Sequence, residues 1–362
     1  MEYSLYLDYH CNLKCPFCYV KDKIESEAKL ASDKTVNEIV KYVKREKQKR
    51  KDKNRDTVFF YGGEPLFNYK VAENFIKKAE KLDLLYGLYT NGTLLDKVPL
   101  NFLKNFSIIF VSISGDKKIQ EKYRGGGSFE KIIKNIKKIK LKLKDTIFIA
   151  RMTIIEEDNI YNSAVNLEKH FDYIHWQIVN QPKFLNPGKF IRNYNKNIEK
   201  LFDYWLANFR QGKNIGLIPF QAVIASLFFN YQKERTSFRC GAGKDMQIID
   251  YDGSIYWCDE LVGRERAKIG EVNAKTILEY KAHTGLFDDC LKCKMSIICR
   301  GRCRRSLEEY PKNHIRHYCR LTRSLLKVIL KNKAELQAII KQRKLTLDDI
   351  YHLPEGCTEE IP

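Results

Sequence analysis

Residues 3–18 read YSLYLDYHCNLKCPFC, an apolar run rich in tyrosine and leucine followed at once by three closely spaced cysteines. The run has the composition of a β-strand, and the cysteines stand at its carboxyl end. No fourth cysteine lies close by, so Cys11, Cys15 and Cys18 can hold three irons of a 4Fe–4S cluster and leave the fourth iron without a protein ligand. An iron with an open position can bind a substrate or a cofactor.

Strand-like and helix-like segments alternate through the first half of the chain. The β-rich runs after Tyr3–Asp8 are Thr57–Tyr61, Tyr86–Tyr89, Ser107–Ser112, Thr146–Ile155 and Ile174–Val179. Helical patterns cover Asp33–Lys47, Val71–Leu82, Ser128–Leu143 and Tyr161–Phe171. This order predicts an α/β fold with a parallel sheet of right-handed βαβ units, that is, a partial (β/α)6 barrel open on one side.

Polar motifs follow the predicted strands in the same way as the cysteines do. They are Gly62-Gly63-Glu64-Pro65, Thr90-Asn91-Gly92 and Ser112-Ile113-Ser114-Gly115. In parallel α/β folds the chemistry lies at the carboxyl ends of the strands. The motifs and the three cysteines are therefore expected to converge on one rim of the barrel.

Seven more cysteines gather near the carboxyl end of the chain, in a region with few long periodic elements. They are Cys240, Cys258, Cys290, Cys293, Cys299, Cys303 and Cys319, and Cys357 follows alone. Close spacing favours metal ligands over disulfides, and bound clusters would supply the core that this region lacks. We expect a barrel domain over 1–181, a helical connecting segment over 182–239, a cysteine-rich domain over 240–320, and a helix and tail over 321–362.

Composition limits the expected location and partners of the protein. The chain has 362 residues, 44% hydrophobic content and a formal charge of +20. It has no apolar run of the roughly 18 residues that span a membrane and no signal peptide, so we expect a cytoplasmic protein without a membrane partner. The lysines alternate with isoleucine and leucine as on solvated helix faces, which argues against a nucleic-acid partner; a surface that attracts an acidic peptide is the alternative.

The amino-terminal cysteines allow two kinds of site. His10 could complete a Cys3His zinc site. The spacing, with Phe17 before the last cysteine, instead resembles the C-x3-C-x2-C loop of radical S-adenosylmethionine (radical SAM) enzymes. That resemblance implies SAM bound at the open iron, with Gly62, Gly63 and Glu64 along its methionine part.

The same resemblance places further contacts with SAM. It implies that Asn91 and Ser112 lie near its ribose or carboxylate and that Arg124 faces its carboxylate. Relatives carry an aspartate two residues after that serine, whereas this chain has Ser114 there and Asp116 two residues later.

The carboxy-terminal cysteines match the seven-cysteine SPASM pattern of radical SAM enzymes that modify peptides. By that resemblance an outer auxiliary 4Fe–4S cluster is held by Cys290, Cys293, Cys299 and Cys319. The inner one is held by Cys240, Cys258 and Cys303 and is one cysteine short. Asp259 matches a catalytic aspartate of the anaerobic sulfatase-maturating branch, where it would accept a proton, and the alternative is a carboxylate that caps a turn.

The sequence therefore predicts a radical SAM–SPASM enzyme with three 4Fe–4S clusters. It would cleave SAM to a 5′-deoxyadenosyl radical and abstract hydrogen from a peptide or protein residue. A ferredoxin or flavodoxin would donate electrons, and a separate leader-recognition protein is a further candidate partner. The alternative within the family is an anaerobic sulfatase-maturating, formylglycine-generating enzyme. Other classes left open are a non-catalytic iron–sulfur electron carrier and an RNA-modifying enzyme.

Overall fold

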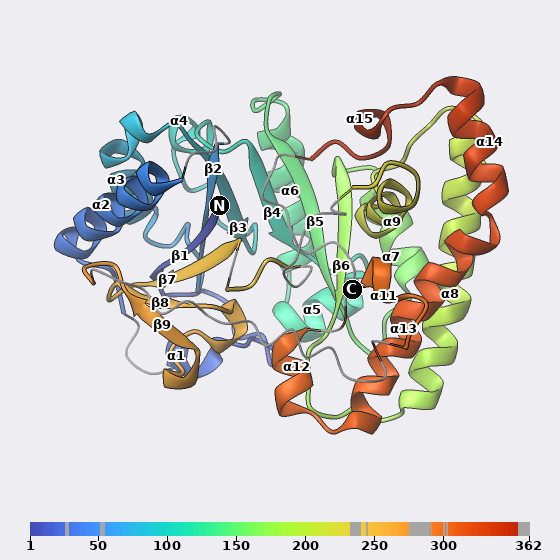
Figure 1. Ribbon diagram of the computed structural model, residues 1–362. Coiled ribbons are helices and arrows are strands. Elements are labelled where there is room, and N and C mark those ends of the chain that lie inside the picture. Colours follow the sequence, from blue (N-terminus) through green and yellow to red (C-terminus); the bar gives the residue numbers. More distant parts are fainter. Residues whose placement is uncertain are drawn as a thin grey trace.

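The computed structural model describes residues 1–25, 29–50, 55–231, 240–243, 245–274, 290, 292–299, 301 and 303–353 (Figure 1). Its first half is a sheet of parallel strands in chain order: β1 (Glu2–Asp8), β2 (Asp56–Gly62), β3 (Leu84–Thr90), β4 (Ile108–Ser112), β5 (Ile147–Ile154) and β6 (Tyr173–Ile178). Each strand pairs in parallel with the next one. The predicted α/β fold and all six predicted strands are therefore confirmed.

Helices connect these strands. They are α1 (Lys21–Glu25), α2 (Asp33–Lys49), α3 (Tyr69–Lys78), α4 (Leu100–Leu103), α5 (Lys117–Arg124), α6 (Ser128–Lys140) and α7 (Ile160–Leu167). The four predicted helices correspond to α2, α3, α6 and α7. The segment predicted as one helix to Leu82 divides into α3 and a short 3-10 turn, Glu80–Leu82.

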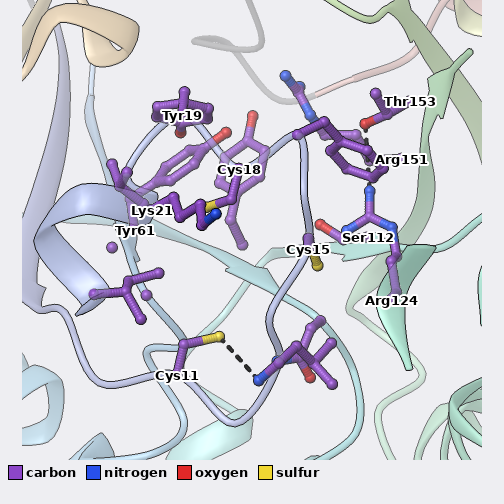
Figure 2. Close-up of a pocket in the computed structure, with 18 of the residues that line it drawn as sticks. Cys11, Cys15, Cys18, Tyr19, Lys21, Tyr61, Ser112, Arg124, Arg151 and Thr153 are labelled. Carbon is purple, nitrogen blue, oxygen red and sulfur yellow. Dashed lines mark hydrogen bonds between the residues drawn. The ribbon is translucent and has the colours of Figure 1, made fainter. Parts of the chain in front are cut away.

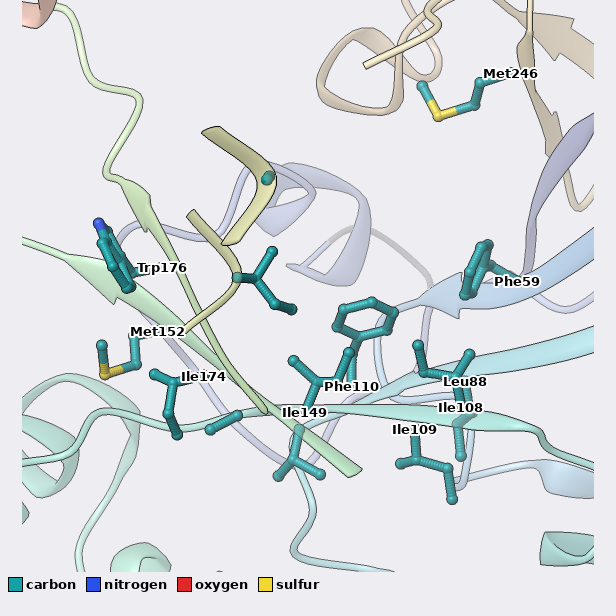
Figure 3. Close-up of a cluster of buried hydrophobic side chains, with 14 of the residues drawn as sticks. Phe59, Leu88, Ile108, Ile109, Phe110, Ile149, Met152, Ile174, Trp176 and Met246 are labelled. Atoms are coloured by element: carbon teal, nitrogen blue, oxygen red, sulfur yellow. The ribbon is translucent and has the colours of Figure 1, made fainter. Parts of the chain in front are cut away.

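The barrel core is filled by large side chains from neighbouring strands (Figure 3). Phe59, Leu88, Phe110, Ile149 and Trp176 are each at most 3% exposed. Such strands read as nearly continuous apolar runs because both faces of a parallel sheet are covered. All seven residues of β1 are buried, including its polar residues Glu2, Ser4 and Asp8.

The cysteine-rich region extends the same sheet. Its strands β7 (Met246–Asp250), β8 (Ser254–Tyr256) and β9 (Lys268–Glu271) give the order β6-β5-β4-β3-β2-β1-β7-β8-β9 in the described part of the chain. β7 runs parallel to β1, with Leu5 opposite Ile249. A tight turn joins β7 and β8 into a hairpin, and Gly253 in it has a φ of +88°. The sequence did not predict that this hairpin would join the barrel.

Helices of the connector and the tail pack together beside β6 (Figure 1). They are α8 (Pro187–Arg210), α9 (Ile218–Phe228), α13 (Lys312–Lys331), α14 (Lys333–Arg343) and α15 (Leu347–Ile350), with the short α11 (Ser296–Cys299) and α12 (Arg304–Glu309) nearby. Helix α13 packs against α8 and crosses the expected boundary between 320 and 321. In the described ranges no helix has the length and apolar character needed to cross a bilayer.

One close contact in the barrel core gives a test of the packing. A Cβ added at Gly87, on β3, would lie 2.1 Å from the ring of Phe59. We expect Gly87→Ala to destabilise the fold by about 1–3 kcal/mol because the ring must move within a filled core. The matched control is Gly126→Ala, since nothing lies within 4 Å of a Cβ there. Thermal unfolding followed by circular dichroism should show a lower melting temperature for the first variant only, and equal melting temperatures would contradict this packing.

Candidate active site

The cysteine loop leaves the carboxyl end of β1 and is held by polar contacts with its neighbours. His10 Nδ1 lies 2.5 Å from the Asp8 carboxylate, and the Asn12 amide donates to Thr93 Oγ1 at 2.8 Å. Within the loop the Cys18 N–H donates to the Cys15 carbonyl at 3.1 Å, and α1 begins three residues later. The loop is therefore fixed at both ends before any cofactor is added.

The three cysteines line one cavity of about 550 Å³ at the carboxyl ends of the strands (Figure 2). Most of the residues predicted to contact SAM line the same cavity: Phe17, Gly62, Gly63, Asn91, Ser112 and Arg124. They come from segments as far apart as the cysteine loop and the end of α5. The structure thus brings together what the sequence predicted to converge.

Burial disfavours the charged form of the cysteine thiols that line this cavity. It raises the pKa of Cys11 to about 12, and it also raises the pKa of Cys18. Thiolates here need a cationic partner, as the irons of a cluster would be. In the described residues no three His, Cys, Asp or Glu side chains lie close enough to hold a single metal ion. Cysteines arranged around a cavity fit a cluster, where each thiolate holds a different iron, better than a single zinc ion.

Arg124 is the cation of this cavity that fits an anionic ligand best. The residue is 8% exposed, its guanidinium carbon lies 5.0 Å from the Phe17 ring centre, and Nη2 donates to Thr153 Oγ1 at 3.3 Å. Its Nε is buried and has no hydrogen-bond partner in the described part of the chain. Arg124 lines the cavity, so a ligand carboxylate there can pair with its charged guanidinium.

The local sequence explains why Arg124 points into the cavity. Asp116 caps the first turn of α5 by accepting the N–H of Ile119 at 3.0 Å, and Gly125 ends the helix with a φ of +105°. Arg124 is therefore the last residue of a short helix with both ends defined. Asp116, which stands two residues later than the aspartate of the relatives, serves here as that cap.

Glu64 lies beneath the cavity and is not among its lining residues. It is fully buried, and its carboxylate accepts hydrogen bonds from the Asn91 N–H at 2.6 Å, Thr90 Oγ1 at 2.8 Å and the Leu66 N–H at 3.0 Å. Burial raises its pKa to about 7. In this structure Glu64 holds the loop that presents Asn91, while its predicted position along the methionine part of SAM stays a prediction.

The two glycines before Glu64 are required by the approach of two strands. A Cβ on Gly63 would lie 2.5 Å from the carbonyl oxygens of Tyr9 and His10, and Gly62 has a φ of +133°. Side chains at either position would push the end of β2 away from the end of β1. Their first role is therefore to let the two strand ends meet beside the cysteine loop.

Several lining residues were missed by the sequence analysis. They are Tyr61, Tyr89, Arg151, Thr153, Gln177 and Glu260. Arg151 lies with its guanidinium carbon 5.4 Å from the ring centre of Tyr89. All but Glu260 stand in the carboxyl-terminal halves of β2, β3, β5 and β6. The expectation that chemistry lies at the carboxyl ends of parallel strands would therefore also have located them.

The outer set of carboxy-terminal cysteines meets in a second cavity of about 470 Å³. Cys290, Cys293, Cys299 and Cys319 all line it. Of the inner set, Cys258 is buried, and burial, then Asp259, then Cys303 raise the pKa of its thiol. The four outer cysteines therefore line one cavity, the inner set of Cys240, Cys258 and Cys303 stays a prediction, and Cys357 lies outside the described residues.

Asp259 stands between two environments. Its Oδ1 accepts the Glu260 N–H at 2.8 Å, which is the turn-capping contact, and lies 3.7 Å from the Cys258 sulfur. Glu260, the next residue, and Tyr19 both line the SAM-side cavity. Asp259 thus stands between Cys258 and a residue of that cavity in the chain.

Comparison with known proteins shows which family and which relatives this chain is similar to. Residues 7–161 match the family described as the Radical SAM superfamily. The cysteine-type anaerobic sulfatase-maturating enzyme of Clostridium novyi is 29% identical over 331 residues, which cover 83% of this chain and 86% of that enzyme. Radical SAM cyclopropyl synthase TigE of Paramaledivibacter caminithermalis is 21% identical over 325 residues, covering 83% of this chain and 66% of the synthase.

A solved structure has the same fold. Native anSMEcpe with bound AdoMet aligns with a TM-score of 0.75 at 20% identity, covering 95% of this chain and all of that one (100%). Fold, cysteine loop and family match define a radical SAM enzyme, which binds SAM beside an iron–sulfur cluster. More particularly, the chain is homologous to the anaerobic sulfatase-maturating enzymes.

The position of Glu64 leads to a test. Glu64→Gln replaces one acceptor oxygen with an NH2 group, so one of the three donors loses its partner at a cost of about 1–3 kcal/mol. We expect a lower melting temperature and an SAM affinity reduced about tenfold, because Asn91 is no longer held in place. The control is Glu80→Gln, at an exposed glutamate. Thermal unfolding and anaerobic SAM titration measure the two effects, and wild-type values for both would refute this role.

Proposed function

We propose that this enzyme modifies a residue of a peptide or protein and that it holds three 4Fe–4S clusters. One is bound by Cys11, Cys15 and Cys18, and two lie within 240–320. The observation that carries the proposal is the pair of separate cysteine-lined cavities, one with the predicted SAM contacts and one with the outer cysteine set. An electron carrier alone would have no use for the larger cavity. We propose the same domain boundaries as above, at residues 181, 239 and 320, although α13 crosses the last of them.

The residues of the first cavity have distinct tasks in this proposal. Bound SAM and its cluster supply a 5′-deoxyadenosyl radical that removes a hydrogen atom from the substrate. Arg124 binds the SAM carboxylate through its guanidinium, and Ser112 and Asn91 add polar contacts at the rim. Phe17 stacks on Arg124 and keeps its guanidinium in place.

Sulfatase maturation is the specific candidate within this class. The relatives now favour the branch, since three sulfatase-maturating enzymes named as cysteine-type match 83–85% of the chain. We propose a cysteine of a sulfatase-type peptide as the substrate residue, with Asp259 as the group that accepts its proton. A ferredoxin or flavodoxin would supply electrons, and a leader-recognition protein is a further candidate partner.

The test of the proposal is reconstitution without oxygen. With iron, sulfide, a reductant and SAM, the enzyme should form 5′-deoxyadenosine and contain about twelve irons per chain. Cys290→Ser should lose up to about four irons and keep the first cluster, whereas Cys15→Ser should abolish SAM cleavage. Iron analysis and chromatography of the nucleoside measure both. Bound zinc, or iron without any SAM cleavage, would speak against the proposal.

The proposed role of Asp259 has its own test. Asp259→Asn keeps the hydrogen bond from the Glu260 N–H but cannot accept a proton. We expect modification of a synthetic sulfatase-type peptide with a single cysteine to fall about 100-fold or more while SAM cleavage continues. Mass spectrometry of the peptide and nucleoside assays separate the two steps, and Asp259→Glu and iron content are the controls. Full peptide modification by the asparagine variant would leave the carboxylate only its turn-capping role.

A further inference from the structure

Helix α13 carries a stripe of positive charge along one side. Its lysines and arginines recur every three or four residues, at Lys312, Arg316, Arg320, Arg323, Lys327 and Lys331, and all six are exposed. This spacing places them on one face, and the helix contains no aspartate or glutamate to offset them. Like charges at this spacing weaken a helix, so helix stability does not account for the stripe.

The opposite side of α13 belongs to the protein core. Ile315, Tyr318, Leu321, Leu325 and Ile329 are each at most 4% exposed, and the helix packs against α8 and α9. A helix that binds a membrane surface would need this apolar side free to enter the lipid. The charged side is therefore the only one that α13 can present to a partner.

The stripe crosses the cavity of the outer cysteines. Arg316, Arg320 and Arg323 line that cavity together with Lys292, and its described lining contains no carboxylate. Arg323 Nη2 lies 3.7 Å from the sulfur of Cys293. The positive charge is thus concentrated around the group of thiols that lies nearest to this surface.

An exposed apolar side chain stands beside these cations. Ile297, on α11 between Cys293 and Cys299, is 81% exposed. An apolar contact surrounded by charge is the usual composition of a small protein–protein interface. Nucleic-acid surfaces instead alternate basic groups with stacking aromatics, and the exposed side of α13 carries none.

We propose that the basic face, formed by the charged side of α13 and residues 292–297, is the docking surface for an acidic one-electron carrier protein. The inference rests on the proposed function, in which the four outer cysteines hold a cluster just beneath this face. The carrier would give one electron to the cluster held by these cysteines, so that the carrier would be oxidised and the cluster reduced. Docking here leaves the SAM-side cavity, lined by a different set of residues, open to the substrate.

The experiment compares charge reversal on this face with equal reversal elsewhere. In the reconstituted enzyme, Lys294→Glu combined with Lys327→Glu changes two exposed lysines that do not line the cavity. The matched control is Lys134→Glu combined with Lys138→Glu, two exposed lysines on α6. Oxidised flavodoxin, an acidic carrier, is titrated against each variant at low and at high salt by calorimetry.

We expect the basic-face variant to bind flavodoxin at least about fivefold more weakly at low salt, with the difference shrinking as salt screens the charges. The α6 variant should stay within about twofold of wild type. Equal affinities for the two variants would overturn the proposal. So would an RNA oligonucleotide that binds the basic face more tightly than flavodoxin does and displaces it.

A chemical reductant separates this inference from the proposed function. With dithionite in place of the carrier, both variants should cleave SAM at the wild-type rate and keep their iron. Dithionite-driven cleavage together with equal carrier binding rejects the docking surface alone. If dithionite drives no SAM cleavage even in the wild type, the proposed function fails and the docking inference fails with it.

Discussion

The parallel pairing of β1 on both of its edges is the constraint on which the site depends. β1 bonds to β2 on one side and to β7 on the other, so a strand from the first ten residues joins two regions that are more than 180 residues apart in sequence. The cysteine loop leaves the end of this strand. A shift in the register of β1 would move the cysteine loop relative to both the barrel rim and the cysteine-rich region. The reason is that strand register fixes which face of the sheet each side chain occupies.

A partly buried ion pair reinforces that pairing next to the cysteines. Lys23, on the helix after the cysteine loop, donates to one carboxylate oxygen of Asp250 at 2.6 Å, and the Tyr9 hydroxyl donates to the other at 2.7 Å. Asp250 ends β7. Helix α13 is held to the end of β6 as well. The Tyr318 hydroxyl of α13 donates to the Val179 carbonyl, just after β6, at 2.8 Å. The cavity is therefore framed by contacts between the barrel and the carboxy-terminal half at both edges.

Much of this arrangement was predictable because it depends on local signals. Buried parallel strands read as apolar runs, and the polar motifs after them mark the rim, so the barrel and the cavity residues Gly62, Gly63, Asn91 and Ser112 were predictable from these signals. Phe17 and Arg124 were predicted from the family resemblance alone. The pairing of β7 with β1 did not, because a partner across a parallel sheet leaves no periodic trace in either strand. Nor did the position of Glu64 under the cavity, since a sequence shows that a carboxylate follows two glycines but not which donors will surround it.

The central place of β1 also affects how the chain is made. Synthesis proceeds from the amino terminus, so the barrel strands emerge well before Met246–Asp250. Until then β1 has an open edge with unpaired backbone groups, the kind of edge on which other strands can add and chains can aggregate. The strand that carries the cysteine loop is thus the last of the barrel strands to be closed. A nascent or truncated chain ending before β7 would expose the very segment that must later hold iron.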